Sequence, residues 1–204
     1  MRSKFSCAIV VVAALAALNL ASARADGHIT ACDRLASHPE DPDKVVPGVP
    51  TSAVDQPAAI AACEVVVADD PSDMRATYQL ARVLFYAGRS ADAVATMQVA
   101  AEGGYRQAQF VMGALISNKR PDASEDICDA EHWWYESAKN GRLAAQVSYV
   151  RHVTKGYFDA CELRASVKDM EAFLDNVRQN DRDYYVRLLL ADLTEDLAAY
   201  KAGQ

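Results

Sequence analysis

Apolar residues recur every three or four positions along most of the chain after residue 58, which is the spacing of amphipathic helices. No segment shows sustained alternation of apolar and polar residues, so we predict no β-sheet. Short turns with glycine or proline separate the patterns, and glycine after a helix accepts the left-handed backbone that ends it. The predicted helices cover residues 58–68, 73–86, 91–101, 105–117, 128–139, 142–154, 160–178 and 182–201.

Residues 26–57 have a different pattern, with a short predicted helix inside residues 27–37. Five prolines and one glycine follow between His38 and Pro57. Because proline fixes φ and lacks an N–H donor, we expect an extended, irregular loop here. Its acids Glu40, Asp41 and Asp43 do not have the spacing of a calcium-binding loop, so we interpret them as solvated loop charges.

The first 25 residues have the three parts of a secretory signal: the basic residues Arg2 and Lys4, an apolar run over residues 7–18, and small residues ending at Ala25. The apolar run is shorter than the ~20 residues that span a membrane. We therefore expect cleavage after Ala25 and no stable membrane insertion of the mature chain. This signal predicts a periplasmic or secreted protein of a Gram-negative bacterial type.

The charge of the chain limits its partners. Removing residues 1–25 takes away three basic residues and no acids, so the net charge changes from −7 to −10. Binding to nucleic acid or to an anionic membrane needs clustered lysine and arginine. No such cluster exists in the sequence, so we do not expect a nucleic-acid partner.

Four cysteines remain after the predicted cleavage, and an even number in an exported chain indicates disulfides. Three pairings are possible. The spacing favours Cys32 with Cys63 and Cys128 with Cys161, because each pair is separated by about the length of one helical hairpin. The alternative, a zinc site, typically uses cysteines only two to four residues apart. We therefore predict no metal.

The chain contains an internal repeat. Residues 101–109 align with residues 138–146 at an offset of 37, and four of the nine positions carry the same alanine, glycine or glutamine. Small residues let successive helices approach closely, and the glycine reverses the chain between them. The repeat therefore predicts stacked helical hairpins.

These residues resemble two related repeat families. The Sel1-like pattern is matched by Ala130, Trp134, Tyr135, Ala138, Gly141 and Ala145. The preceding unit resembles a tetratricopeptide repeat through Leu80, Gly88, Ala93 and Ala100. The chain departs from the patterns at Val150, where the Sel1-like pattern has glycine, and at Ser90, where an aromatic residue is usual.

The resemblance implies an all-α fold, an α-solenoid of stacked antiparallel hairpins whose neighbours bury each other's apolar faces. We expect a signal peptide at residues 1–25, a helix and proline-rich loop at 26–57, repeats at 58–179 and a capping helix at 180–204. We predict that the capping helix turns Tyr185, Leu188, Leu189 and Leu193 toward the stack.

The sequence offers little catalytic chemistry. It contains neither G-x-S-x-G nor S-x-x-K, and no glycine-rich phosphate loop. The four histidines, His28, His38, His132 and His152, do not share the i, i+4 spacing of helical metal ligands. We therefore predict a protein that is not an enzyme and needs no cofactor.

A binding groove is the stronger candidate. In tetratricopeptide-like stacks the first helix of each hairpin lines a concave face. Arginines beside aromatic residues in such a groove suit a peptide or a carboxylate. The alternative is that the aromatic residues pack against the N-terminal hairpin. The predicted groove residues are Arg75, Tyr78, Arg82, Phe85, Gln107, Phe110 and Arg151.

Three classes of function follow from these observations. The resemblance implies a scaffold or adaptor that binds protein partners, with a regulator of envelope signalling as one form of it. The second class is a protein that binds cell-wall glycan or muropeptide, and the third is a hydrolase of cell-wall material or β-lactams. The last is disfavoured, because related cysteine-rich hydrolases place a close disulfide in each repeat, which this chain lacks.

Overall fold

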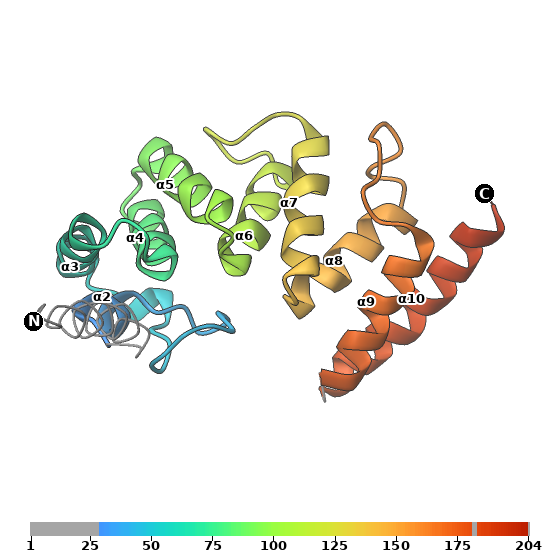
Figure 1. Ribbon diagram of the computed structural model, residues 1–204, viewed down its shortest axis with the longest axis horizontal. Helices are drawn as coiled ribbons and strands as arrows, with labels where there is room; N and C mark the ends of the chain where they lie inside the picture. Colours follow the sequence, from blue (N-terminus) through green and yellow to red (C-terminus); the bar gives the residue numbers. More distant parts are fainter. Residues whose placement is uncertain (1–28, 181–182, 204) are drawn as a thin grey trace, which may run out of the picture.

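The computed structural model describes residues 29–180 and 183–203, so the predicted signal peptide lies outside it. Every regular element in these ranges is helical, which confirms the all-α prediction for this part of the chain (Figure 1). The elements are α2 (Ala31–Ala36), the 3-10 helix η2 (Thr51–Ala53), α3 (Gln56–Asp69), α4 (Met74–Tyr86), α5 (Ser90–Glu102), α6 (Arg106–Ser117), α7 (Ile127–Lys139), α8 (Leu143–Thr154), α9 (Val167–Asn180) and α10 (Tyr184–Ala202).

Successive helices pack against each other, so the chain forms a stack of antiparallel hairpins from α3 at one end to α10 at the other (Figure 1). The predicted turns lie where the glycines stand. Gly88, Gly104, Gly141 and Gly156 have φ between 75° and 85°, a conformation that side chains with a Cβ rarely adopt. The loop between α2 and α3 is irregular apart from η2, as its prolines predict.

The repeat at an offset of 37 has a structural counterpart. The side-chain nitrogen of Gln109 in α6 donates to the carbonyl of Ala101 at 3.1 Å. Gln146 in α8 donates in the same way to Ala138, also at 3.1 Å. Each glutamine oxygen then accepts from an asparagine at the end of the next outer helix, Asn140 or Asn176, at 2.9 Å. The same two carbonyls, in the last turns of α5 and α7, also accept from the backbone N–H of Gly104 and Gly141, so each glutamine adds a second donor at the end of the helix.

The interior consists of three apolar clusters that follow the stack, as expected when each hairpin buries its face against its neighbours. The two predicted disulfides are both present. Cys32 pairs with Cys63 beside the N-terminal cluster, and Cys128 pairs with Cys161 at the C-terminal one.

Gly113 in α6 also matters for packing, because a Cβ there would lie 2.5 Å from a ring carbon of Trp134.

The helix predicted from residue 160 begins later, at Val167. Residues 155–166 form a loop that is fixed by long-range contacts: Phe158 is 1% exposed, and Cys161 is in the second disulfide. The fully buried Glu131 accepts from the backbone N–H of Arg164 at 2.9 Å and from its guanidinium at 2.5 Å. Helical pattern at these positions is overridden by tertiary contacts.

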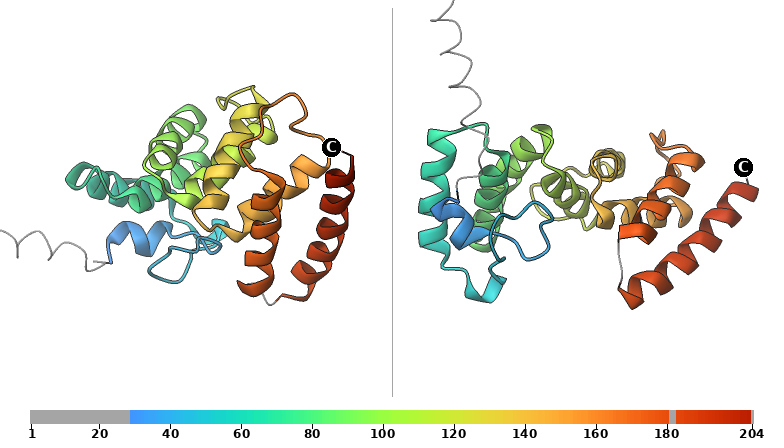
Figure 2. Two further views of the ribbon diagram at one scale, coloured as in Figure 1. Left: turned by 45° about the vertical axis from the view of Figure 1, so that its right-hand side comes forward. Right: turned by 60° about the horizontal axis from the view of Figure 1, so that its bottom comes forward.

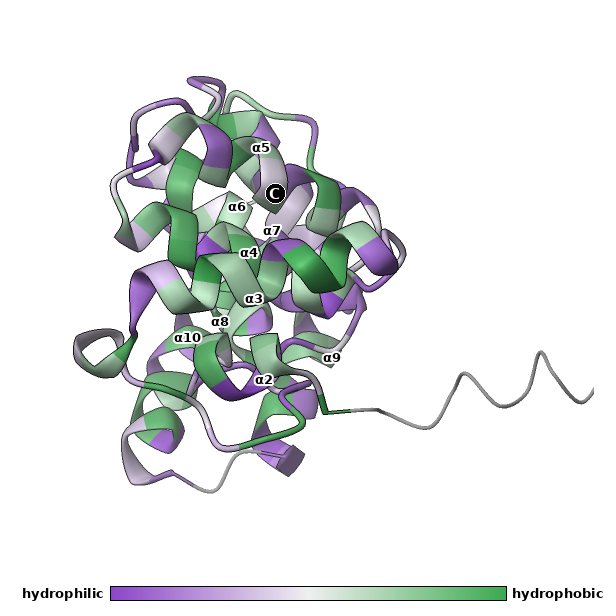
Figure 3. Ribbon diagram, turned by 90° about the vertical axis from the view of Figure 1, so that its left-hand side faces the viewer, coloured by the Kyte–Doolittle hydropathy of each residue, from purple (hydrophilic) through white to green (hydrophobic). Residues whose placement is uncertain are grey.

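The last two helices, α9 and α10, end the stack (Figure 2). The prediction for the inward face of α10 was wrong at two positions, since Tyr185 is 76% exposed and Leu188 is 49% exposed. Leu193 is buried as predicted and Leu189 packs partly buried against the core, and Leu190 and Leu197 complete the buried face. Figure 3 shows polar and apolar residues interspersed along the helices, and none of the described helices is both long and apolar enough to span a membrane.

Candidate binding groove

Residues 38–49, here called the strap, lie against the first helices of successive hairpins (Figure 2). The strap is irregular, with turns over residues 38–41 and 41–44, and a backbone hydrogen bond of 2.7 Å from Val49 to Ser37 closes its base. It contacts α4, the start of α6 and the start of α8, the surface on which the resemblance places the groove. The chain therefore fills part of the predicted groove with its own N-terminal segment.

Arg82 of α4 holds both ends of the strap. Its Nη1 donates to the carbonyl oxygens of Ala36 (2.7 Å) and Ser37 (2.9 Å), and its Nη2 donates to that of Val49 (2.6 Å). Its Nε donates to the hydroxyl of Tyr86 at 3.1 Å. The Arg82 side chain is 4% exposed. All of its nitrogens are therefore bound within the chain.

The acids of the strap bind the next helix. Asp41 is fully buried and accepts from the Tyr105 hydroxyl at 2.7 Å. Asp43 accepts from Arg106 Nε at 2.7 Å and from its Nη2 at 2.6 Å, a bidentate pair. Our interpretation as solvated loop charges was therefore wrong for Asp41 and Asp43, whereas the Glu40 side chain is exposed. Burial raises the pKa of Asp41 above its ordinary value, although the Tyr105 bond opposes this effect.

Arg142, the residue before α8, completes the attachment of the strap. Its Nη2 donates to the Glu40 carbonyl at 2.9 Å, and its Nε donates to the side chain of Gln107 at 2.7 Å. Its guanidinium lies 5.3 Å from the centre of the Phe110 ring. Burial and the positive charge of Arg82 lower the pKa of His38 at the start of the strap to about 4, so this ring is neutral at pH 7.

A second ionic contact joins α2 to α4. Asp33 is 1% exposed and accepts from Arg75 Nε at 2.8 Å and from the Gln79 amide at 3.1 Å. Burial alone would raise the pKa of Asp33, but hydrogen bonds from Thr30, Arg75 and Gln79 hold it below its ordinary value. Arg75 is thus bound within the chain, like Arg82.

The remaining predicted residues divide into two groups. Tyr78 is 1% exposed and Gln107 is 2% exposed, whereas Phe85 and Phe110 are half-buried. Tyr78 packs its ring 5.4 Å from that of Tyr105. Tyr78 is therefore packed between α4 and the start of α6 and is not open to solvent. Phe85 lines a cavity between α4, α5 and α6.

Arg151 differs from the other predicted arginines. The first helices begin after Asp73, Tyr105 and Arg142, and counting from these residues places Arg151 of α8 at the position of Arg82 in α4. Arg151 is exposed, and its guanidinium has no hydrogen-bond or ion-pair partner among the described residues. The same position thus holds a bound arginine in α4 and an open one in α8.

Sequence reasoning missed Asp41, Tyr105, Arg106 and Arg142 as groove residues. The signal available was compositional: acids in a proline-rich loop, and arginine or tyrosine at the starts of first helices. No local sequence pattern indicates that the loop acids bind these arginine and tyrosine side chains. Among the described residues, no group of three or more histidine, cysteine, aspartate or glutamate side chains could hold a metal ion.

Comparison with known proteins finds similarity only in structure. No protein-family model and no curated protein matches the sequence. The fold is similar to the crystal structure of a Sel1 repeat protein from Oxalobacter formigenes, with a TM-score of 0.51 and 20% identity, covering 63% of this chain and 96% of that chain. It is also similar to c5321, a protective antigen of uropathogenic Escherichia coli strains displaying an SLR fold, with a TM-score of 0.54 and 19% identity.

The second alignment covers 79% of this chain but 32% of the antigen, so this chain spans about a third of that protein. Sequence identities of 19% and 20% are evidence for a shared fold only. Together with the stacked hairpins and the repeated glutamine bonds, they show that the chain has the Sel1-like repeat fold, an all-α solenoid.

Proposed function

We propose that this protein is a non-catalytic scaffold that binds an extended segment of a partner protein on the groove surface around Arg151. The observation that supports the proposal is the pair of equivalent arginines. Arg82 donates to three carbonyl oxygens of this chain's own N-terminal segment: those of Ala36 and Ser37, directly before the strap, and that of Val49, at the end of the strap. Arg151 has the same position on α8 and is open to solvent, so it offers an external segment the same bonds.

The surroundings of Arg151 suit a polypeptide. Val147, one turn earlier on the same helix, is partly exposed and provides apolar contact area. The mature chain would carry a net charge of −10, and Arg151 is a local positive site on this acidic molecule. A carboxylate on the partner would be attracted to that site. A guanidinium binds a carboxylate or two carbonyls with defined geometry, which gives the contact specificity.

We place this activity in the periplasm or outside the cell. The predicted signal peptide and the two disulfides both support an oxidising compartment. Regulation of envelope signalling would be one use of such a scaffold. Binding to cell-wall glycan is the alternative, which sedimentation with purified sacculi would reveal.

Site-specific photo-crosslinking in the producing cell tests the proposal. A benzophenone amino acid replaces Val147 in the groove or Val99 in α5, which is 51% exposed on an outer helix. We expect a protein adduct from position 147 and none from position 99. Arg151→Glu should abolish the adduct from position 147, whereas Lys168→Glu, an equal charge change at an exposed residue of α9, should not. Equal adducts in both variants would refute the proposal.

A further inference from the structure

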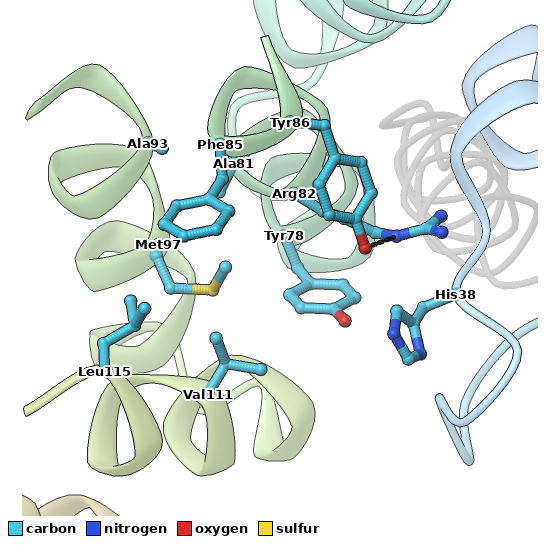
Figure 4. Close-up of a pocket in the computed structure, with 10 residues that line it drawn as sticks. All are labelled: His38, Tyr78, Ala81, Arg82, Phe85, Tyr86, Ala93, Met97, Val111 and Leu115. Atoms are coloured by element: carbon cyan, nitrogen blue, oxygen red, sulfur yellow. Dashed lines mark hydrogen bonds between the residues drawn. The ribbon is translucent and has the colours of Figure 1, made fainter. Parts of the chain in front are cut away.

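A half-open cavity of about 200 Å³ lies between α4, α5 and α6, beside the start of the strap (Figure 4). Its interior is apolar, with Phe85 from α4, Met97 from α5 and Leu115 from α6 facing one another across the space. Phe85 and Leu115 are only partly buried. The cavity therefore has both an apolar interior and an opening to solvent.

One end of the cavity is polar. His38 lies there, and its Nδ1 accepts from the backbone N–H of Glu40 at 3.0 Å, so the neutral ring carries its proton on Nε2. The Tyr86 hydroxyl accepts from Arg82 Nε, which leaves its own proton for another acceptor. Neither proton is bound by a described residue. The polar end thus offers two hydrogen-bond donors and no carboxylate.

The size and chemistry of the cavity define its ligand. A cavity of about 150 Å³ lined by aliphatic and aromatic side chains holds a benzene-sized molecule. A single aromatic ring or a leucine side chain therefore fits this one. The donors at its edge suit a carbonyl oxygen, and the strap that begins at His38 is itself polypeptide whose Glu40 and Val49 carbonyls accept from arginine side chains.

We propose that this cavity binds one phenylalanine or leucine side chain of an extended protein segment, while a carbonyl of that segment accepts a hydrogen bond from Tyr86. The inference rests on the proposed function, because it names a residue that the partner contributes. The site is separate from Arg151: its walls are α4, α5 and α6, whereas Arg151 is on α8.

Titration of the full mature chain with blocked amino acids tests the site. The probes are N-acetyl-phenylalaninamide and N-acetyl-leucinamide, with N-acetyl-alaninamide as the control, and the signal is the ¹³C-methyl resonance of Met97. We expect saturable shifts with the first two probes only. Met170, which is buried in the C-terminal cluster, should not respond.

Matched variants locate the binding. Ala93 lines the cavity from α5 and is 2% exposed, whereas Ala95 on the same helix is exposed. Ala93→Met should fill the space and reduce probe affinity at least tenfold, and Ala95→Met should leave it unchanged. Val111→Phe fills the cavity from α6 and should have the effect of Ala93→Met, which covers the case that one filled variant does not fold.

The outcomes separate this inference from the proposed function. A Met97 shift that toluene produces but both large amides do not would show a small-molecule cavity and overturn the proposed peptide anchor. Equal probe affinity in the filled variants, or no shift with any probe, would also overturn it. If position 147 of the otherwise native chain gives no protein adduct while the two large amides still bind, the proposed function is refuted and the cavity site is not.

Discussion

Replacing Arg82 with methionine tests how strongly the strap depends on one side chain. Methionine keeps the apolar stem and removes the guanidinium, which leaves the carbonyls of Ala36 and Val49 without their donors, whereas that of Ser37 still accepts from the Val49 N–H. An unsatisfied buried polar group costs about 1–3 kcal/mol. Because the strap can loosen and admit water, we expect the lower part of the range summed over these two carbonyls, about 2–4 kcal/mol.

Urea unfolding followed by circular dichroism at 222 nm, with both disulfides oxidised, measures this loss. With a slope of about 2 kcal/mol per molar urea, the midpoint should fall by about 1–2 M. The matched control is Arg151→Met at the equivalent position of α8, which should change the unfolding free energy by no more than about 0.5 kcal/mol because the side chain is exposed. A loss below about 1 kcal/mol in Arg82→Met would refute the structural role of this residue.

Three further predictions follow from the same structure. His38 has its pKa lowered to about 4 in the folded chain, so its contribution to stability is present above pH 6.5 and is lost as the pH falls toward 4. The stability of the native chain relative to His38→Gln should therefore decline over this range in denaturant titrations, and a constant difference would contradict it. Gly113→Ala should lower thermal stability by about 1–3 kcal/mol through overpacking against Trp134, measured by calorimetry, and an unchanged melting temperature would count against this contact. Deleting residues 184–204 should expose the C-terminal core and cause aggregation on size-exclusion chromatography, whereas a soluble truncation with a cooperative melt would show that α10 is dispensable.

The parts of the fold that follow from local pattern could be predicted from the sequence. Helix period, turn glycines and small residues act between neighbours, and the spacing of Cys32 and Cys63 reflects one hairpin. The strap could not be predicted, because Asp43 binds Arg106 across 63 positions and no periodicity connects them. For the same reason the groove position of Arg82 was identified, but its engagement by the strap was not.

The start of α9 was missed for a related reason. Residues 160–166 include good helix formers, but the disulfide at Cys161 and the bonds from Arg164 to Glu131 fix them as a loop. Intrinsic helix propensity amounts to less than 1 kcal/mol per residue, so a few such contacts outweigh it.

The hydrogen bond from Arg142 to Glu40 joins residues 102 positions apart. In an ordinary solenoid each unit contacts only the next, and unfolding can begin at an end and proceed unit by unit. Here the N-terminal segment ties α4 to the beginnings of α6 and α8, so fraying of one hairpin breaks contacts made by the others. This half of the molecule is therefore expected to melt as a single cooperative block. During folding, the block is complete only when Arg142 has bound the strap.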